Sequence, residues 1–292
     1  MRMSGRGNED GKNWLLIKHR DRFALQGQDE DPLIADPRSV VTQRSLAEIA
    51  ESKEFKATTL DPQSLSQARR GPFPRQLQPQ LATLGSSVPP GTQWLHELKL
   101  DGYRLLASRE GSSIRLRTRR GQDWTDRFSK IAEAVKSLPI ESAVLDGEVV
   151  VLGRDGTSDF QALQNAIRNG HKAPLVYYVF DLPYLNGFDL TAAPLVERKQ
   201  LLERLMAGLP SEWQSTLRLS KHIVGNGEAV IRQACRLGAE GIVSKLAESR
   251  YQQRRSQSWI KVKCSARQEF VVGGYATSSD AARPFGSLLL GY

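Results

Sequence analysis

The amino-acid sequence predicts an α+β domain, that is, a mixed α/β fold with antiparallel sheets and flanking helices. The first observation is that many strand-like runs alternate with fewer helical patterns from Gly91 onward, which is typical of this class. The second is the helical pattern at 226–238, which has an apolar stripe and stops at Gly238. The third is length, because 292 residues suffice for two domains or for one large domain with extensions.

Residues 1–90 contain few such elements. A short apolar strand at 14–18 has no partner nearby, and a short helix is expected at 44–55. The strand is typical of the end of a preceding module. We expect 26–38 to be a linker and 58–90 to be a second linker or an extended arm. The range 1–90 is therefore predicted to be a partly disordered tail and linker.

One domain is predicted over 91–264. Its strands are expected at 94–99, 103–109, 114–118, 143–152, 175–181, 217–221, 240–245 and 258–264, and its helices at 126–137, 160–168, 194–208 and 226–238. Two further strands, 269–275 and 287–292, cannot bury a core of their own. Residues 265–292 are therefore expected to begin a second β domain that is incomplete in this chain.

Composition narrows the class of protein. The net charge of +9 and the pI near 9.7 favour a polyanionic partner, most often nucleic acid, over a merely basic protein. No apolar run is long enough to span a membrane, and none suits a secretion signal. Cys235 and Cys264 do not indicate a disulfide framework, and no Cys/His cluster has zinc-site spacing. The default expectation is a reducing, cytoplasmic setting.

The stretch Trp94–Arg104 carries the first candidate catalytic residue. As a strand it places Glu97 and Lys99 on one face, just before Asp101-Gly102. A lysine held at a strand end beside carboxylates is a candidate nucleophile. The alternative has even weight on this stretch alone, because Asp-Gly is a strong hairpin signal and a strand lysine usually faces solvent.

Three later segments add groups that suit a nucleotide. Glu148, after Asp146-Gly147, and Glu240 each stand at the head of a strand, where a carboxylate is more often paired or functional than idle. A further hairpin with a solvent-facing glutamate is the alternative for Glu148. Phe180 is either a core residue or a stacking platform for a base. Val243 shares a strand face with Lys245 and offers an apolar surface to a planar ring.

Lys261 and Lys263 are the most informative pair after Lys99. They project from the same face of one strand and repel each other unless an anion lies between them, as a polyphosphate would. An edge strand guarded by lysines is the alternative. It does not explain why these lysines occur together with Lys99 and the carboxylates.

In this order the segments resemble the motifs of the covalent nucleotidyltransferases, which are ATP-dependent DNA ligases, RNA ligases and mRNA capping enzymes. Lys99-Leu100-Asp101-Gly102 is similar to their Lys-x-Asp-Gly motif, and the later motifs match Asp146-Gly147-Glu148, the Phe180 strand, Glu240-Gly241 and Lys261-x-Lys263. The closest similarity is to the ligase module of bacterial end-joining ligases of the ligase D family. Residues 13–24 resemble the end of the phosphoesterase module that precedes it there. The resemblance implies an ATP-grasp-like adenylation domain followed by an oligonucleotide-binding (OB) barrel.

The resemblance also implies residue roles. Lys99 would attack the α-phosphorus of ATP to form Lys-AMP, and Glu97 would place the adenine through its backbone. Arg104 and Glu148 would hold the ribose, and Phe180 and Val243 would enclose the base. Glu240, with Glu148, would bind Mg²⁺ or Mn²⁺, while Lys261, Lys263 and, with less support, Lys245 would contact phosphate. Arg119 would handle the DNA 5′-phosphate, although Arg120 stands where the family has asparagine.

Elementary chemistry agrees with these roles. A free lysine amine is protonated at neutral pH and is not nucleophilic. Neighbouring cations disfavour the ammonium form and also stabilise the charge of the pentavalent phosphorus. A cationic pocket around Lys99 is therefore expected.

The sequence departs from the family after Cys264. The family has an OB barrel there, with a last basic motif that orients pyrophosphate, and 267–292 would supply only about two of its strands. We expect this chain by itself to self-adenylate poorly and yet to seal a pre-adenylated nick. Rapid, complete gain of one AMP in an intact-protein mass spectrum would contradict this.

Two rival interpretations remain open from the sequence. An RNA ligase or capping enzyme shares the motifs. A comparison of nicked RNA with nicked DNA as substrate distinguishes these enzymes from a DNA ligase. The second alternative is a non-catalytic module that only binds DNA ends. It would be excluded if the Lys99→Ala protein lost AMP transfer and still bound DNA. The resemblance further implies nicked or broken double-stranded DNA as partner, a Ku-like end-binding protein, no membrane, a monomer, and a bacterial, nucleoid-associated location.

Overall fold

The computed structural model describes residues 60–153, 156–169, 173–264, 271–277 and 286–291. They belong to one compact unit, Ala57–Tyr292. The boundary expected at residue 91 therefore falls inside this unit. The strand expected at 14–18, the linker at 26–38 and the helix at 44–55 lie outside the described residues.

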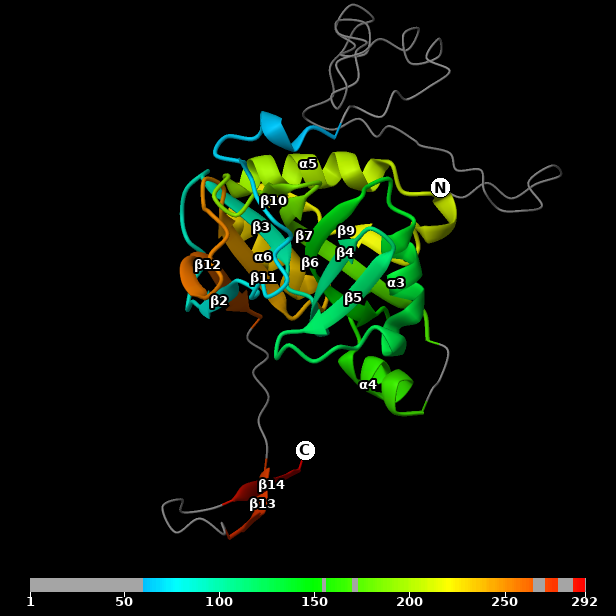
Figure 1. Ribbon diagram of the computed structural model, residues 1–292. Helices are drawn as coiled ribbons and strands as arrows, with labels where there is room; N and C mark the ends of the chain where they lie inside the picture. The colour runs from blue at the N-terminus through cyan, green and yellow to red at the C-terminus, as the bar shows by residue number, and fades with distance from the viewer. Residues whose placement is uncertain (1–59, 154–155, 170–172, 265–270, 278–285, 292) are drawn as a thin grey trace, which may run out of the picture. The chain divides into compact units, whose positions relative to one another are not determined.

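Two sheets form the body of the unit, and the main strands and helices expected from the sequence are present within a few residues (Figure 1). The larger sheet has the order β1-β8-β7-β6-β4-β5, with β9 beside β7, and the smaller has the order β10-β3-β11-β12-β2. The strands of the larger sheet are β1 Arg69–Arg70, β4 Tyr103–Glu110, β5 Ser113–Thr118, β6 Ser142–Val151, β7 Leu175–Leu185, β8 Phe188–Asp189 and β9 Leu217–Leu219. Those of the smaller are β2 Leu81–Leu84, β3 Trp94–Leu98, β10 His222–Val224, β11 Gly241–Leu246 and β12 Arg255–Lys263.

Most strand pairs are antiparallel, as expected; β7–β9 and β2–β12 are parallel. The helices are α3 Ser129–Lys136, α4 Phe160–Asn169, α5 Leu195–Ala207 and α6 Gly227–Arg236, with short 3₁₀ turns at Pro62–Ser64, Asp126–Phe128 and Ser211–Trp213. No helix in the described ranges is long and apolar enough to cross a membrane.

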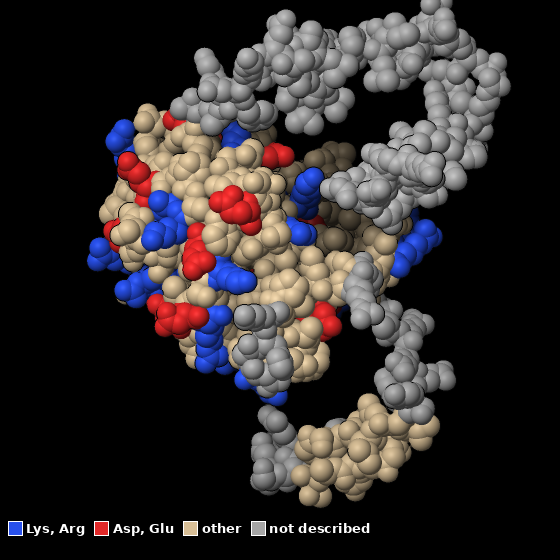
Figure 2. All heavy atoms as spheres, turned by 90° about the vertical axis from the view of Figure 1, so that its right-hand side faces the viewer, with Lys and Arg blue, Asp and Glu red and all other residues tan. Residues whose placement is uncertain are grey.

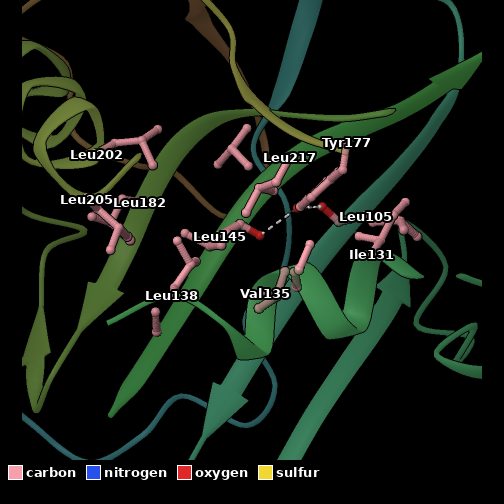
Figure 3. Close-up of a cluster of buried hydrophobic side chains, with 14 of the residues drawn as sticks. Leu105, Ile131, Val135, Leu138, Leu145, Tyr177, Leu182, Leu202, Leu205 and Leu217 are labelled. Atoms are coloured by element: carbon pink, nitrogen blue, oxygen red, sulfur yellow. Dashed lines mark hydrogen bonds between the residues drawn. The ribbon is translucent and has the colours of Figure 1, made fainter. Parts of the chain in front are cut away.

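The main hydrophobic core lies between one face of the larger sheet and helices α3, α4 and α5 (Figure 3). Tyr177 crosses this core from β7, and its hydroxyl lies 3.0 Å from Leu105 O and 3.1 Å from Leu145 O. The other face of the sheet carries Arg104, Asp146, Glu148 and Phe180. Side chains alternate between the two faces of a strand, so the strands that bury apolar residues on one face place these residues on the other.

The two Asp-Gly pairs do not form hairpins. Asp101-Gly102 connects β3 in the smaller sheet to β4 in the larger one. Asp146-Gly147 lies inside β6, at a register irregularity against β7. A Cβ on Gly147 would meet the Tyr177 ring at 2.4 Å, so glycine is required by close packing rather than by a turn.

The segment expected as a linker or an extended arm contributes a strand to each sheet. β1 pairs with β8, and β2 pairs with β12. Gln80 anchors the segment, because its side-chain amide donates to Ser256 Oγ (3.3 Å) and Ser258 Oγ (3.1 Å). Proline and glutamine content therefore marks an ordered arm here.

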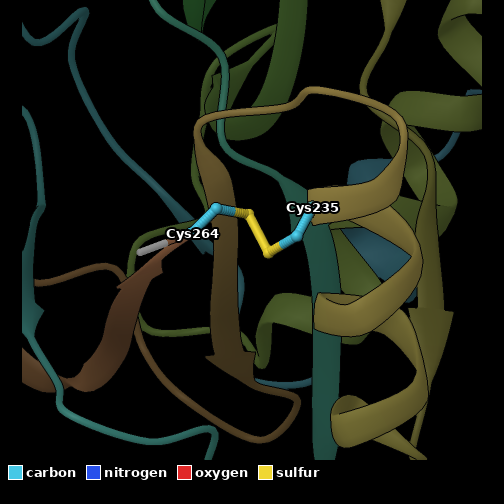
Figure 4. The surroundings of a disulfide bond; sticks show 2 residues. All are labelled: Cys235 and Cys264. Atoms are coloured by element: carbon cyan, nitrogen blue, oxygen red, sulfur yellow. A yellow bond between two sulfur atoms is a disulfide. The ribbon is translucent and has the colours of Figure 1, made fainter. Parts of the chain in front are cut away.

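The smaller sheet is covered by α6 and closed by a disulfide (Figure 4). Cys235 near the end of α6 is bonded to Cys264, the residue after β12, with Cα atoms 5.4 Å apart. The two cysteines, which were not expected to make a disulfide framework, are therefore bonded to each other. The 29-residue separation carries no local signal, because only the tertiary fold brings the two ends together.

β13 Val271–Ala276 and β14 Ser287–Gly291 form a two-stranded antiparallel sheet of their own. Its apolar residues, including Val271, Tyr275 and Leu289, are exposed. This agrees with the two strands expected there, and membership of an OB barrel stays a prediction.

On the face seen in Figure 2, basic and acidic side chains of the main body are interspersed, so the net positive charge forms no single basic surface there.

Candidate active site

A pocket of about 200 Å³ lies between the two sheets. Both sheets and the connections between them supply its predicted lining residues: Glu97, Lys99, Arg104, Arg119, Glu148, Phe180, Val243, Lys245 and Lys261. Glu240 and Lys263 lie next to it: Glu240 contacts both Lys99 and Lys263. The structure thus brings together every site residue expected from the sequence.

Lys99 stands at the end of β3 and contacts a carboxylate. Its side chain is 17 % exposed, and its amine donates to Glu240 Oε2. Lys263 Nζ lies 3.0 Å from Glu240 Oε1. Burial raises the pKa of Glu240, but the hydrogen bonds from these two lysines outweigh burial and lower it overall. The expected cationic surroundings of Lys99 therefore also contain a carboxylate, ionised at neutral pH, that touches its amine.

Lys261 belongs to the same cluster. Burial lowers the pKa of Lys261, and the positive charges of Lys99, Arg255 and Lys263 lower it further. Concentrated positive charge of this kind favours binding of an anion. Arg119, an exposed residue after β5, also lines the pocket.

Glu148 faces the pocket from β6, opposite Arg104 on β4. Burial raises the pKa of Glu148 to about 7, although the charges of Arg104 and Lys99 oppose this. Within the described part of the chain its carboxylate makes no ion pair. A carboxyl group held in this way gains from a cation or a hydrogen-bond donor supplied by a ligand.

Arg104 lines the pocket and is held by several hydrogen bonds. Its guanidinium donates to both oxygens of the buried Asp146 (2.5 and 2.7 Å) and to Gln80 O (3.0 Å). Asp146 also accepts from the Tyr251 hydroxyl (2.6 Å). Arg104 lies 4.3 Å from the centroid of the Phe180 ring. Most hydrogen-bond donors of Arg104 are therefore already engaged within the protein. The contact of Arg104 with the ribose remains a prediction.

Phe180 forms one aromatic wall. It packs edge to face on Trp259, with ring centroids 6.0 Å apart, and Lys245 Nζ lies 4.2 Å from its centroid. Val243 lines the pocket from β11, in the smaller sheet. The two residues expected to enclose a base thus come from different sheets.

Glu97 has a structural side chain in addition to its expected backbone role. Its carboxylate is buried and accepts from Lys199 (2.6 Å), Lys245 (2.9 Å) and Ser220 Oγ (2.8 Å). Burial would raise the pKa of Glu97, but the two lysines lower it to about 2. Lys245, expected to contact phosphate, is directed to this carboxylate. Burial lowers the pKa of Lys245 to about 8, against the opposing charge of Glu97.

The carboxylates suit a magnesium-type ion only in company with substrate. No group of three or more His, Cys, Asp or Glu residues arranged for a metal occurs among the residues that the structure describes. Mg²⁺, however, commonly binds through one or two carboxylates plus substrate phosphates. Glu148 and Glu240 meet that requirement beside a lysine cluster fit for phosphate.

Several residues that line or support the pocket were not given a site role from the sequence, although Asp146 stands in the Asp146-Gly147-Glu148 motif. Asp146, Tyr251, Trp259 and Lys199 position predicted residues, and Arg255 lines the pocket. One signal was available for Lys199. It falls with Leu195, Leu202 and Leu205 on the buried stripe of α5, where an unpaired charge would be costly.

A family model for the ATP-dependent DNA ligase domain matches residues 79–263, the range that holds the pocket. The chain belongs to this family of ATP-dependent DNA ligase domains. Among individual proteins, it is 40% identical over 294 residues to the multifunctional non-homologous end joining protein LigD of Pseudomonas aeruginosa, covering 98% of this chain and 34% of that protein. It is 35% identical over 218 residues to the LigD DNA repair protein of Mycobacterium tuberculosis, covering 74% of this chain and 28% of that one.

The chain thus spans about a third of the length of the curated relatives it matches. Among solved structures, it resembles a mycobacterial DNA ligase D complexed with ATP and MES, with TM-score 0.58 and 35% identity over 74% of this chain and 67% of that one. The M. tuberculosis LigD ligase domain gives TM-score 0.57 and 34% identity over 74% and 68% of the two chains. These matches confirm the expected adenylation-domain fold.

Proposed function

We propose that this chain carries out the nucleotidyl-transfer chemistry of a bacterial ATP-dependent DNA ligase. The observation that supports it most is the position of the Lys99 amine, which lies at a pocket between two sheets, in contact with Glu240 and close to Lys261, Lys263 and Glu148. The family membership agrees with it, and so does the ATP bound to the related mycobacterial DNA ligase D.

The reaction has three balanced steps. The neutral Lys99 Nζ attacks the α-phosphorus of ATP, so that an N–P bond forms, the bond to the pyrophosphate oxygen breaks and the amine loses a proton. An oxygen of a DNA 5′-phosphate then attacks the phosphorus of Lys-AMP, so that a P–O bond forms, the N–P bond breaks, the Lys99 nitrogen takes up a proton, and AMP is joined to the DNA end. Finally the 3′-hydroxyl attacks the DNA 5′-phosphate, its proton departs, and AMP is released.

The pocket residues contribute positioning and charge. Phe180 and Val243 enclose the base, Glu97 supplies a backbone contact to it, and Arg104 and Glu148 serve the ribose. Lys261 and Lys263 counter phosphate charge, Arg119 approaches the DNA 5′-phosphate, and Lys245, paired with Glu97 beside Phe180, stands at the base end of the pocket. Glu240 and Glu148 would hold Mg²⁺ or Mn²⁺, which polarises phosphoryl oxygens when bound.

The biological setting is inferred from the relatives. Proteins named for non-homologous end joining share 32–40% identity with this chain. We therefore infer that nicked or broken double-stranded DNA is the partner, with sealing in double-strand break repair. A Ku-like end-binding protein, a monomeric state and a cytoplasmic, nucleoid-associated location belong to the same proposal.

The test is an intact-protein mass spectrum after incubation with ATP and Mg²⁺. We expect a slow, incomplete gain of one AMP, and the adduct should be stable to alkali and labile to acid, as a P–N bond requires. Lys99→Ala should abolish the gain, whereas Lys130→Ala, which removes an exposed lysine on α3, should leave it intact. An adduct of equal yield in Lys99→Ala would refute the assignment.

A second assay separates the nucleic-acid substrates. Pre-adenylated nicked DNA and pre-adenylated nicked RNA are offered in parallel, so that formation of Lys-AMP is not required. Sealing of the DNA nick is expected, and preferential sealing of the RNA nick would favour an RNA ligase instead.

A further inference from the structure

Lys199 is a buried cation that the proposed chemistry does not use. It lies on α5 with 3% of its surface exposed. It does not line the pocket. Its ammonium donates to Glu97 Oε1 (2.6 Å), to Ser220 O (3.1 Å) and, more weakly, to Phe180 O (3.5 Å). Three acceptors match the three protons of an ammonium group, so Lys199 is fully engaged.

These three acceptors come from different parts of the fold. Glu97 is on β3 of the smaller sheet, Phe180 is on β7 of the larger one, and Ser220 lies in the connection between β9 and β10, which links the sheets. The same division separates the two walls of the pocket. Lys199 therefore contacts both walls from behind, through a carboxylate on one side and a main-chain carbonyl on the other.

Glu97 passes this constraint on to the pocket. Its second oxygen holds Lys245 Nζ at 2.9 Å, and that amine lies 4.2 Å from the Phe180 ring centroid and 4.3 Å from that of Trp259. When Glu97 is held in place, Lys245 is held too, and its amine is the donor at the aromatic end of the pocket. A site that is ordered before its ligand arrives loses less entropy on binding and discriminates better.

We propose that Lys199 is a positioning residue for the nucleotide base: it holds Glu97, and through it Lys245, at a set distance from Phe180, so that the base end of the pocket is preorganised. The proposal rests on the proposed function, because it assumes that the pocket takes a nucleotide. Lys199 touches neither base nor phosphate, and its effect is on affinity and base selection.

The adjacent Arg198 provides a matched control. It lies on the same helix and is fully buried, and it pairs with Asp181 at 2.7 Å. Its remaining donors go to Ala193 O and Ser249 O. None of these partners lines the pocket. Arg198→Met therefore removes an equally buried charge from the same helix without releasing Glu97.

The experiment measures binding of labelled ATP and GTP by equilibrium dialysis with Mg²⁺, using the full chain with Lys99→Ala so that no adduct forms. In this parent we expect ATP to bind more tightly than GTP. Added Lys199→Met should weaken ATP binding about tenfold and bring the ATP-to-GTP affinity ratio towards one. Added Arg198→Met should leave the ratio at the parent value, whatever it does to stability.

Three outcomes would overturn the positioning role: parent-like ATP affinity and ratio in Lys199→Met, an equal change of ratio in Arg198→Met, or a parent that does not discriminate between the two purines. If thermal melting shows Lys199→Met to be unfolded, Lys199→Gln carries the same test, since it keeps an N–H donor for the carbonyls. The proposed function fails separately, by the absence both of ATP binding in the parent and of an AMP adduct in the wild-type chain.

Discussion

At the scale of single residues, the raised pKa of Glu148 makes binding of metal–ATP dependent on pH. A carboxyl group with a pKa of about 7 is mostly protonated below that pH, and in the protonated form it does not bind a cation. Removal of Lys99, whose charge lowers the pKa of Glu148, raises that pKa further in the Lys99→Ala protein. We therefore expect the affinity of this protein for ATP with Mg²⁺ to fall already as pH drops from somewhat above 7, approaching tenfold per unit for one proton. The measurement is a titration of ATP at several pH values.

Glu148→Gln is the control for this prediction. It has no titrating group at position 148, so only the titration of ATP itself should remain in its profile. Because both proteins lack the Lys99 amine, deprotonation of the nucleophile does not contribute. Identical profiles in the two proteins would show that Glu148 does not govern binding.

Gly147 illustrates a residue whose reason is packing. An alanine Cβ there would lie 2.4 Å from the Tyr177 ring and 2.5 Å from Tyr178 O. We expect Gly147→Ala to lower the free energy of unfolding by about 3 kcal/mol, as overpacking in a rigid core does. Gly71→Ala is the control, because its Cβ would meet only Asp189 Cβ at 3.9 Å. Equal midpoints in urea for both variants would contradict the prediction.

The roles of some site residues could be predicted from the sequence, and the roles of others could not. Lys99, Glu148, Glu240, Lys261 and Lys263 stand in short motifs, so their type and spacing were enough to predict that they meet. Lys199 and Asp146 serve as supports, and their function is visible only from what they contact. The contact between Lys99 and Glu240 was also beyond sequence reasoning, since it depends on β3 pairing with β11.

At the scale of elements, α5 shows how an apolar stripe can include charges. Arg198 lies on its buried face and forms a two-pronged pair with Asp181 on β7 (2.7 and 2.9 Å). The strand and helix patterns predicted both elements, because periodicity depends on the majority of positions. The charged members of the stripe required knowledge of the opposite strand, which no local pattern contains.

This buried pair yields a stability prediction. Arg198→Met leaves the buried Asp181 carboxylate without its ion-pair partner, and we expect the free energy of unfolding to fall by about 3–5 kcal/mol. Arg232 on α6 pairs with Glu228 one turn away at 4.0 Å, with side chains 63% and 65% exposed. Arg232→Ala should change stability by less than about 0.5 kcal/mol. Chemical denaturation measures both, and a loss for Arg198→Met as small as that for Arg232→Ala would contradict the role of burial.

At the scale of the whole molecule, the Cys235–Cys264 disulfide closes a loop that contains much of the pocket. Glu240, Val243, Lys245, Trp259 and Lys261 all lie between its two cysteines. The backbone N–H of Cys264 also donates to Glu240 O at 3.0 Å. The cross-link therefore restrains the segment with β11 and β12, which supplies part of the smaller-sheet wall. The sequence separates these cysteines too far for their pairing to be expected, and composition favoured a reducing setting.

Reduction of this bond should lower stability and leave the fold intact. In the chain-entropy account, opening a loop of this length costs about 3.6 kcal/mol, which for a unit of this size corresponds to a fall in Tm of about 7–14 °C. Scanning calorimetry with and without dithiothreitol measures it, with free thiols counted by mass after alkylation. Cys235→Ser/Cys264→Ser is the control: it should melt at the lower temperature in both conditions. An unchanged Tm on full reduction would show that packing of α6 against β11 and β12 alone holds this wall, because the hydrophobic contacts of Ala234, Ile242 and Val262 would then suffice without the covalent link.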